Sequence, residues 1–128
     1  MMMNCPYCGS SVSNVDASVV YQVPGYGRLW LCDNYPVCDA YVGAHSQNNA
    51  PKGTLANRQL RHWRRNAHAC FDPIWKSGKM SRKKAYKWLC EQMGLTREKA
   101  HIAMFDEQQC RQLIKLCFLR NEQAETGD

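Results

Sequence analysis

The sequence predicts an α+β protein in which a small N-terminal β zinc ribbon precedes a segment of three to four helices. Three observations carry this prediction. Four of the eight cysteines stand in two closely spaced pairs near the N-terminus. Residues 1–44 are rich in β-branched residues and turn formers. After position 53, apolar residues recur with helical spacing.

Length and composition restrict the class of protein. The 128 residues suffice for one domain or a small module with a helical piece, and 45% of them are hydrophobic. No apolar run approaches the roughly 18 residues of a membrane span. The first residues lack the pattern of a secretory signal peptide. We therefore expect a cytoplasmic protein with no membrane partner, and exclude exported fibres, membrane proteins and large multidomain enzymes.

The paired cysteines predict a metal site. Cys5 and Cys8 form a C-x-x-C pair, and Cys32 and Cys38 form a C-x5-C pair. Two thiolates on a tight turn can reach one ion, and Gly9 permits the backbone conformation that such a turn needs. Four thiolates give Zn²⁺ a closed tetrahedral site of the structural type. We therefore predict one structural zinc ion, which supplies on the order of 10 kcal/mol of folding free energy in such peptides.

Other roles for the cysteines stay open. The four thiols could be unrelated, and a catalytic zinc could take His45 as a candidate ligand. A disulfide framework is disfavoured because the expected compartment is reducing. Free cysteines at apolar helical positions usually act as small core hydrophobes. This role is expected for the four cysteines in the second half of the chain: Cys70, Cys90, Cys110 and Cys117.

The ribbon is predicted to span residues 1–45. Val19–Val23 is β-branched and aromatic, which is typical of a strand, and residues 24–27 have turn chemistry. Leu29–Cys32 predicts the returning strand, and residues 40–43 predict a third short strand.

Residues 46–53 are polar and rich in turn formers, so they predict a linker loop before the helical segment at 54–120. Thr54 can cap a first helix that runs to about Phe71. Residues 121–128 are polar and predict a frayed tail. The apolar side of the first helix comprises Ala56, Leu60, Trp63, Ala67 and Cys70 with Phe71.

Boundary signals divide the rest of the helical segment. Asp72 with Pro73 ends the first helix or begins a short turn that Gly78 closes. Ser81 can cap a second helix, which Gly94 closes, and Thr96 can cap a short third one. Asp106 and Gln109 resemble a capping box before the final helix. The apolar positions expected inside these helices are Ala85, Trp88, Leu89, Met93, Cys110, Leu113, Ile114 and Cys117.

Charge is concentrated in the middle of the chain. Residues 1–50 and 101–128 each carry a net charge of −2, and residues 51–100 carry +10, which gives the total of +6. Residues 52–87 hold eleven Lys or Arg residues and one acid. A concentration of one sign predicts attraction to a polyanion. A solvated face that keeps the protein soluble and a surface for an acidic protein are the alternatives.

Arginines form a stripe on the first predicted helix. Arg58, Arg61, Arg65 and His68 recur at helical spacing, and Arg64 lies beside them. The planar guanidinium matches phosphate oxygens, so this stripe predicts contacts with a nucleic-acid backbone without base readout. His68 is expected on the helix face rather than as a ligand. The following segment adds Lys76, Lys79, Arg82, Lys83, Lys84 and Lys87.

The ribbon motifs have a counterpart in a known family. Cys-Pro-Tyr-Cys-Gly at 5–9 and Cys-Asp-Asn-Tyr-Pro-Val-Cys at 32–38 resemble the C-terminal zinc ribbons of bacterial type IA topoisomerases, whose second knuckle reads Cys-x-x-Tyr-Pro-x-Cys. Those ribbons bind single-stranded DNA. Arg28 is the one basic residue inside the ribbon. The resemblance implies stacking on bases for three aromatic residues, with hairpin packing as the alternative: Trp30, Tyr35 and Tyr41.

A longer set of motifs covers most of the chain. It comprises residues 4–44, Gly53-Thr-Leu-Ala-Asn, Leu60-Arg61 with Ala67-His68, Phe71-Asp72-Pro73, Ser77-Gly-Lys-Met-Ser-Arg82 with Ala85-Tyr86, and His101-Ile102. This set resembles a bacterial and phage family described as zinc-finger-containing. The resemblance implies zinc binding and a phage or prophage origin.

The function predicted from these features is non-catalytic binding of DNA or RNA, directed mainly at the phosphate backbone. No Walker, dinucleotide, G-x-S-x-G or HExxH motif occurs, so we expect no enzyme, with a small nuclease as the alternative. The rival function is a protein-interaction adaptor or inhibitor that docks a host protein through the ribbon or the basic helices. The candidate nucleic-acid contacts are Arg28, Trp30, Tyr35, Arg58, Arg61, Arg64, Arg65, Lys79, Arg82, Lys83 and Lys84.

Overall fold

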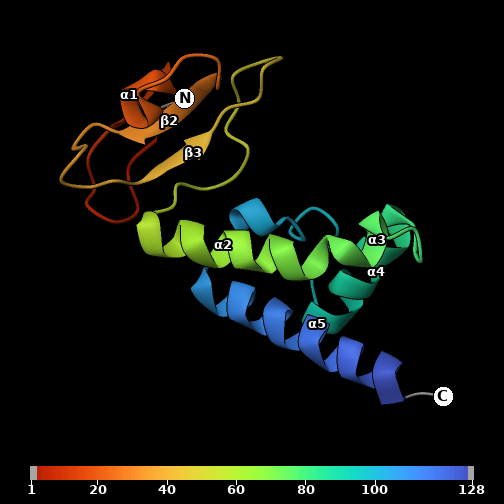
Figure 1. The fold of residues 1–128 in the computed structure, drawn as a ribbon. Coiled ribbons are helices and arrows are strands. Elements are labelled where there is room, and N and C mark those ends of the chain that lie inside the picture. Colours follow the sequence, from red (N-terminus) through yellow and green to blue (C-terminus); the bar gives the residue numbers. More distant parts are fainter. Residues whose placement is uncertain (1–2, 127–128) are drawn as a thin grey trace. The chain divides into compact units, whose positions relative to one another are not determined.

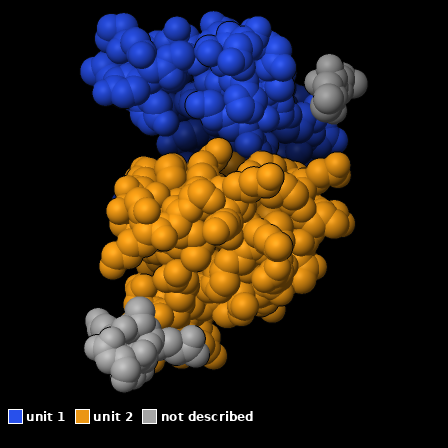
Figure 2. Space-filling view, turned by 90° about the vertical axis from the view of Figure 1, so that its right-hand side faces the viewer, with its two compact units in different colours: residues 1–61 blue, residues 62–128 orange. Residues whose placement is uncertain are grey.

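The computed structural model describes residues 3–126, and the side chains of residues 3–122. The chain divides into two compact units, residues 1–61 and 62–128 (Figure 2). The first contains an antiparallel sheet, and the second consists of helices. The predicted α+β class is thereby confirmed, and the two units are described in turn.

The first unit is built on a three-stranded antiparallel sheet (Figure 1). Its strands are β1 (Val12–Asp16), β2 (Arg28–Cys32) and β3 (Tyr41–Gly43), and β2 lies in the centre. Leu29 and Leu31 alternate with Trp30 along β2 and point to the buried side. Val12 pairs with Cys32, so β1 begins beside the C-terminal end of β2, where the predicted zinc ligand Cys32 lies.

The predicted strand at Val19–Val23 is wrong. Ser18–Tyr21 form a short helix, α1, which Gln22 closes with a φ of 62°. The strand that pairs with β2 lies earlier, and the Asp16 carboxylate accepts a hydrogen bond from the Ser18 N–H (2.9 Å) at the point where the chain leaves it. A strand preference of β-branched residues depends on available pairing. With β2 already paired on both edges, Val19 and Val23 remain exposed.

The predicted linker loop folds back onto the first unit. His45 and Ala50 are joined by a backbone hydrogen bond (2.8 Å), and the Lys52 N–H donates to the Gly43 carbonyl (2.8 Å). Ala56 then pairs with Tyr41 in an isolated antiparallel bridge. Residues of this loop are therefore fixed by the ribbon.

The first long helix, α2 (Arg58–Phe71), begins later than the predicted Thr54. Leu55 and Ala56 are buried in the first unit, and the pairing of Ala56 with Tyr41 keeps this segment extended. The Asn57 side chain accepts a hydrogen bond from the Leu60 N–H (3.0 Å), so Asn57 caps the helix instead.

Helices make up the second unit. After α2 come α3 (Pro73–Lys76), α4 (Arg82–Met93), the 3₁₀ turn η1 (Ile102–Met104) and α5 (Glu107–Thr126). Within the described residues, no helix has the length and apolar composition of a membrane span. The largest fully buried side chains of this unit are Phe71, Phe105, Leu89, Ile102, Leu113, Cys110 and Cys117.

Most predicted boundaries of the later helices are confirmed. Ser81 Oγ accepts a hydrogen bond from the Lys84 N–H (3.1 Å), and Gly94 ends α4 with a φ of 64°. Asp106 and Gln109 form the reciprocal bonds of a capping box (2.8 and 3.0 Å).

Two boundaries differ from the prediction. The helix expected after Thr96 is a turn, in which the Lys99 N–H donates to the Thr96 carbonyl (3.1 Å). The predicted frayed tail begins too early, because α5 continues to Thr126 through residues that are mostly good helix formers. Residues 127 and 128 of that predicted tail lie outside the described part of the chain.

Candidate zinc centre and basic surface

The four predicted zinc ligands converge in the first unit. Their Sγ atoms all lie within 4.8 Å of one another, with 3.4 Å between Cys8 and Cys32 and 3.6 Å between Cys5 and Cys38. Sulfurs placed tetrahedrally around zinc at 2.3 Å are about 3.8 Å apart, whereas a disulfide bond is about 2.05 Å long. The cysteines are free thiols that fit one structural zinc ion, and they do not fit disulfides.

Two tight turns aim these sulfurs. In the first turn, the Gly9 N–H donates to the Cys5 carbonyl (2.9 Å), and Gly9 has a φ of 78° that favours glycine. In the second turn, the Cys38 N–H donates to the Asn34 carbonyl (3.1 Å), and the Asn34 N–H donates to Cys32 Sγ (3.4 Å). Such N–H donors stabilise thiolate, which is the form that binds zinc.

The ligand thiols differ in their environment. Hydrogen bonds with Ser10 lower the pKa of the exposed Cys8 to about 6, whereas burial raises the pKa of Cys32 to about 12. Without a metal, the buried thiol keeps its proton. A metal ion must therefore displace that proton, so zinc binding releases protons and its affinity depends on pH.

The zinc ligands are also part of the hydrophobic core of the first unit. The buried cluster there consists of two ligands and three apolar side chains: Cys5, Cys32, Ala40, Val42 and Leu55. Together with Leu29 and Leu31, this core leaves a unit of about 60 residues marginally stable, and a bound metal would add to that stability. His45 is exposed and lies outside the four-cysteine cluster, and no other such cluster occurs among the described side chains of residues 3–122. A complete set of four thiolates is typical of a structural site.

Two of the four members of the predicted stripe on α2, Arg61 and His68, have partners within the protein. The Arg61 guanidinium donates to the Asp39 and Ala56 carbonyls (2.7 Å each) and pairs with the Asp39 carboxylate (3.2 Å). It also lies 4.0 Å from the centre of the Tyr41 ring. His68 lies 3.6 Å from Asp72. Of the stripe, Arg58, Arg65 and His68 are exposed.

Arg64 must be removed from the candidate phosphate contacts because it is only 8% exposed. Its Nε–H donates to the Phe105 carbonyl (2.9 Å) within the second unit. The sequence placed Arg64 beside a basic stripe, but the helix turns it inward. A buried guanidinium that reaches a main-chain carbonyl is a stabilising element rather than a ligand contact.

Replacing Arg64 should therefore change stability and leave ligand binding by the folded protein unchanged. Arg64→Met keeps most of the apolar stem and removes the donor, so we expect a loss of about 1–3 kcal/mol in the free energy of unfolding. Urea titration measures this loss. Arg65→Met, at the exposed neighbour, is the matched control and should stay within about 0.5 kcal/mol of the wild type. Equal stability of the two variants would contradict the assignment.

The ribbon candidates also have internal partners. The Trp30 indole N–H donates to the Asn49 carbonyl (2.7 Å), and the ring packs partly buried against the core cluster. Tyr35 is partly buried, directly before the cis peptide at Pro36. Arg28 is exposed and donates to the side chain of Asn14 and to its carbonyl (3.2 Å). The exposed ribbon aromatics are instead Tyr7, Tyr21 and Tyr26.

Exposed cations gather at α3, α4 and the turn between them. We call this set the α4 basic surface: Lys76, Lys79, Arg82, Lys83, Lys84 and Lys87, all exposed. Lys76 forms an ion pair with Asp72 (3.7 Å). The other five members form no ion pair with any described side chain. The guanidinium of Arg82 lies 5.4 Å and 5.1 Å from the rings of Trp75 and Tyr86, which restrict its position.

A three-stranded antiparallel ribbon with two cysteine knuckles, followed in sequence by helices, defines a zinc-ribbon protein of the α+β class. The chain belongs to the zinc-finger-containing domain family, whose model matches residues 1–120. The family resemblance predicted from the long set of motifs is confirmed. Comparison with curated proteins and with solved structures gives no match.

Proposed function

We propose that this zinc-finger-containing protein binds nucleic acid without catalysis, by holding the phosphate backbone on the α4 basic surface. The observation that carries the proposal is a group of six exposed cations of which five have no carboxylate partner among the described side chains of residues 3–122. Repulsion between like charges raises the local potential, and phosphate groups relieve it. The zinc centre has a structural role in this proposal.

The position of three of these cations supports a ligand role over mere solubility. Arg82, Lys83 and Lys84 form the first turn of α4, which contains no acidic residue. Acids are favoured there and cations are disfavoured, by about 0.3–1 kcal/mol each, because the helix dipole is positive at this end. A surface needed only for solubility could carry its cations elsewhere at no such cost. A phosphate placed here gains from both the side chains and the dipole.

Fluorescence anisotropy tests the proposal. The probes are random-sequence single- and double-stranded DNA and RNA of about 20 nucleotides, at 50 and 200 mM salt. About six phosphate contacts should reduce affinity on the order of 10³-fold between these salt concentrations. Binding that is absent at 50 mM salt, or insensitive to salt, would overturn the proposal. Incubation of the same probes with Mg²⁺ or Mn²⁺ should leave them intact.

A further inference from the structure

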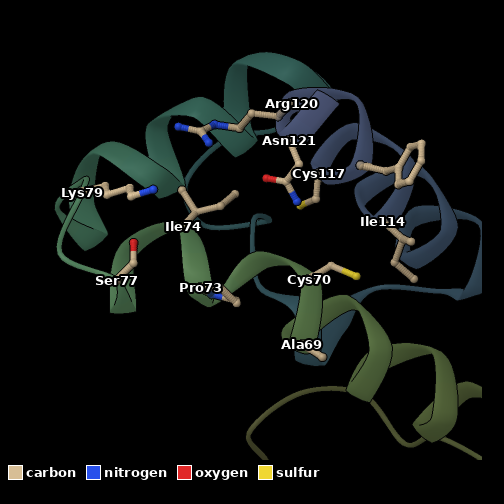
Figure 3. A pocket seen from close by; sticks show the side chains of 11 residues that line it. Ala69, Cys70, Pro73, Ile74, Ser77, Lys79, Ile114, Cys117, Arg120 and Asn121 are labelled. Carbon is tan, nitrogen blue, oxygen red and sulfur yellow. The ribbon is translucent and has the colours of Figure 1, made fainter. Parts of the chain in front are cut away.

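A groove of about 640 Å³ lies in the second unit, between the end of α2, α3 and α5 (Figure 3). Its volume is in the range of sites that bind ligands or the side chains of a partner. Its walls come from these helices and from the turn after α3, which supplies Ser77 and Lys79, and contain no sheet edge. Neither the zinc centre nor the proposed phosphate contacts of α4 explain why this part of the helical unit is hollow.

The groove has an apolar part. Its lining includes Cys70, Ile74, Ile114, Cys117 and Phe118. Phe118 is a large apolar side chain, and it is 62% exposed. An exposed aromatic beside a groove gains free energy when a partner covers it, at roughly 25 cal/mol per Å² of buried apolar surface.

The other part of the groove is cationic. Lys79 and Arg120 line it together with the polar Ser77 and Asn121, and none of its eleven lining residues is acidic. The guanidinium of Arg120 lies 5.8 Å from the ring of Trp88, which limits its movement. Apolar and cationic walls in one groove match a ligand with apolar anchors and carboxylates at one end.

We propose that the groove binds an acidic amphipathic helix of a partner protein. Two or three apolar side chains of that helix, spaced i, i+3 or i+4, i+7, would cover Phe118 and enter between α3 and α5. A carboxylate of the same helix would pair with Arg120 and Lys79. Charge complementarity selects an acidic occupant, and the helical walls favour a helix over an extended strand. This proposal does not rest on nucleic-acid binding, although Lys79 belongs both to the groove and to the α4 basic surface.

Selection from a peptide library tests the acidic preference. The library displays 16-residue helical peptides with Leu, Ile, Met or Phe at i, i+4 and i+7, and with Glu, Lys, Gln or Ser at the other positions. Selection against the full-length zinc-loaded protein should enrich Glu over Lys. Enrichment of Lys, or of no sequence at all, would overturn the proposal.

Variants of the protein test the location with the best selected peptide, labelled for anisotropy. Phe118→Ser and Arg120→Glu should each weaken binding about tenfold or more. Matched controls on the same helix are Leu119→Ser, also at an exposed apolar residue, and Lys115→Glu, at an exposed cation; neither residue lines the groove. Both controls should change affinity less than about threefold.

Three further outcomes would overturn the proposal. Equal losses of affinity in the groove variants and their controls would show that the peptide binds to another surface. Unchanged binding of a peptide with the same composition and scrambled apolar positions would show attraction by charge alone. If the protein dimerises and Phe118→Ser abolishes that dimerisation, the groove binds a second copy of this chain instead.

Discussion

Cys8→Ser should reduce the zinc content from one ion per chain to a small fraction of that value and unfold the first unit. Structural zinc contributes about 10–16 kcal/mol of apparent binding free energy in comparable peptides, as much as the whole stability of a typical domain, about 5–15 kcal/mol. Cys8 is the exposed ligand, so serine fits in its place without disturbing the buried cluster. The loss therefore reports on the metal and not on packing.

Two measurements check this expectation. Elemental analysis gives the zinc content, and amide NMR spectra give the state of each unit. Resonances from β1, β2 and β3 should lose their dispersion, because their core contains two of the ligands. Resonances from α4 and α5 should keep theirs, because the second unit has its own core around Phe71, Leu89 and Phe105.

The matched control is Cys70→Ser, at a partly buried thiol in the helical unit. It should retain one zinc ion and a dispersed ribbon spectrum. A ribbon that stays folded and zinc-loaded in Cys8→Ser would contradict the four-thiolate site. A metal-free mass lower by two or four hydrogen atoms than that of the fully reduced chain, with the disulfides mapped to Cys5, Cys8, Cys32 and Cys38, would also contradict it.

The zinc site was predictable because the residues that form each of its two turns lie next to one another in the sequence. A C-x-x-C pair followed by glycine specifies a turn by itself, and the second pair follows a strand whose Leu29-Trp30-Leu31 pattern alternates clearly. The helix caps at Ser81 and Asp106 depend on residues three positions away, so they were predictable for the same reason.

The contacts of the arginine side chains were not predictable, because their partners lie far away in the sequence. Arg61 finds Asp39 at a separation of 22 residues, and Arg64 finds the Phe105 carbonyl at a separation of 41 residues. Helical spacing alone placed Arg61 and Arg65 on one stripe, although the first is a structural clamp and the second is exposed. In the same way, Val19–Val23 lost its strand because another segment pairs with β2.

Reversing three charges of the α4 basic surface should therefore separate its contribution to binding from that of the arginine stripe on α2, since the sequence predicted contacts at both. Lys83→Glu/Lys84→Glu/Lys87→Glu should lower the affinity for random duplex DNA about 100-fold or more at 50 mM salt, and reduce the salt slope by about three. The three side chains are exposed. Two of them lie in the first turn of α4, where glutamates suit the helix dipole. Thermal stability should therefore stay equal or rise slightly while binding is lost.

Arg58→Glu/Arg65→Glu/Lys115→Glu is the matched control, because it makes the same change in net charge at three exposed positions on α2 and α5. Long-range attraction falls equally in both variants, so any difference between them reports direct phosphate contacts. The control should weaken binding about tenfold less than the α4 variant. If the control loses more affinity than the α4 variant, the arginine stripe predicted from the sequence is the contact surface and the α4 assignment is wrong. If both keep wild-type affinity, phosphate binding by the helical unit is excluded.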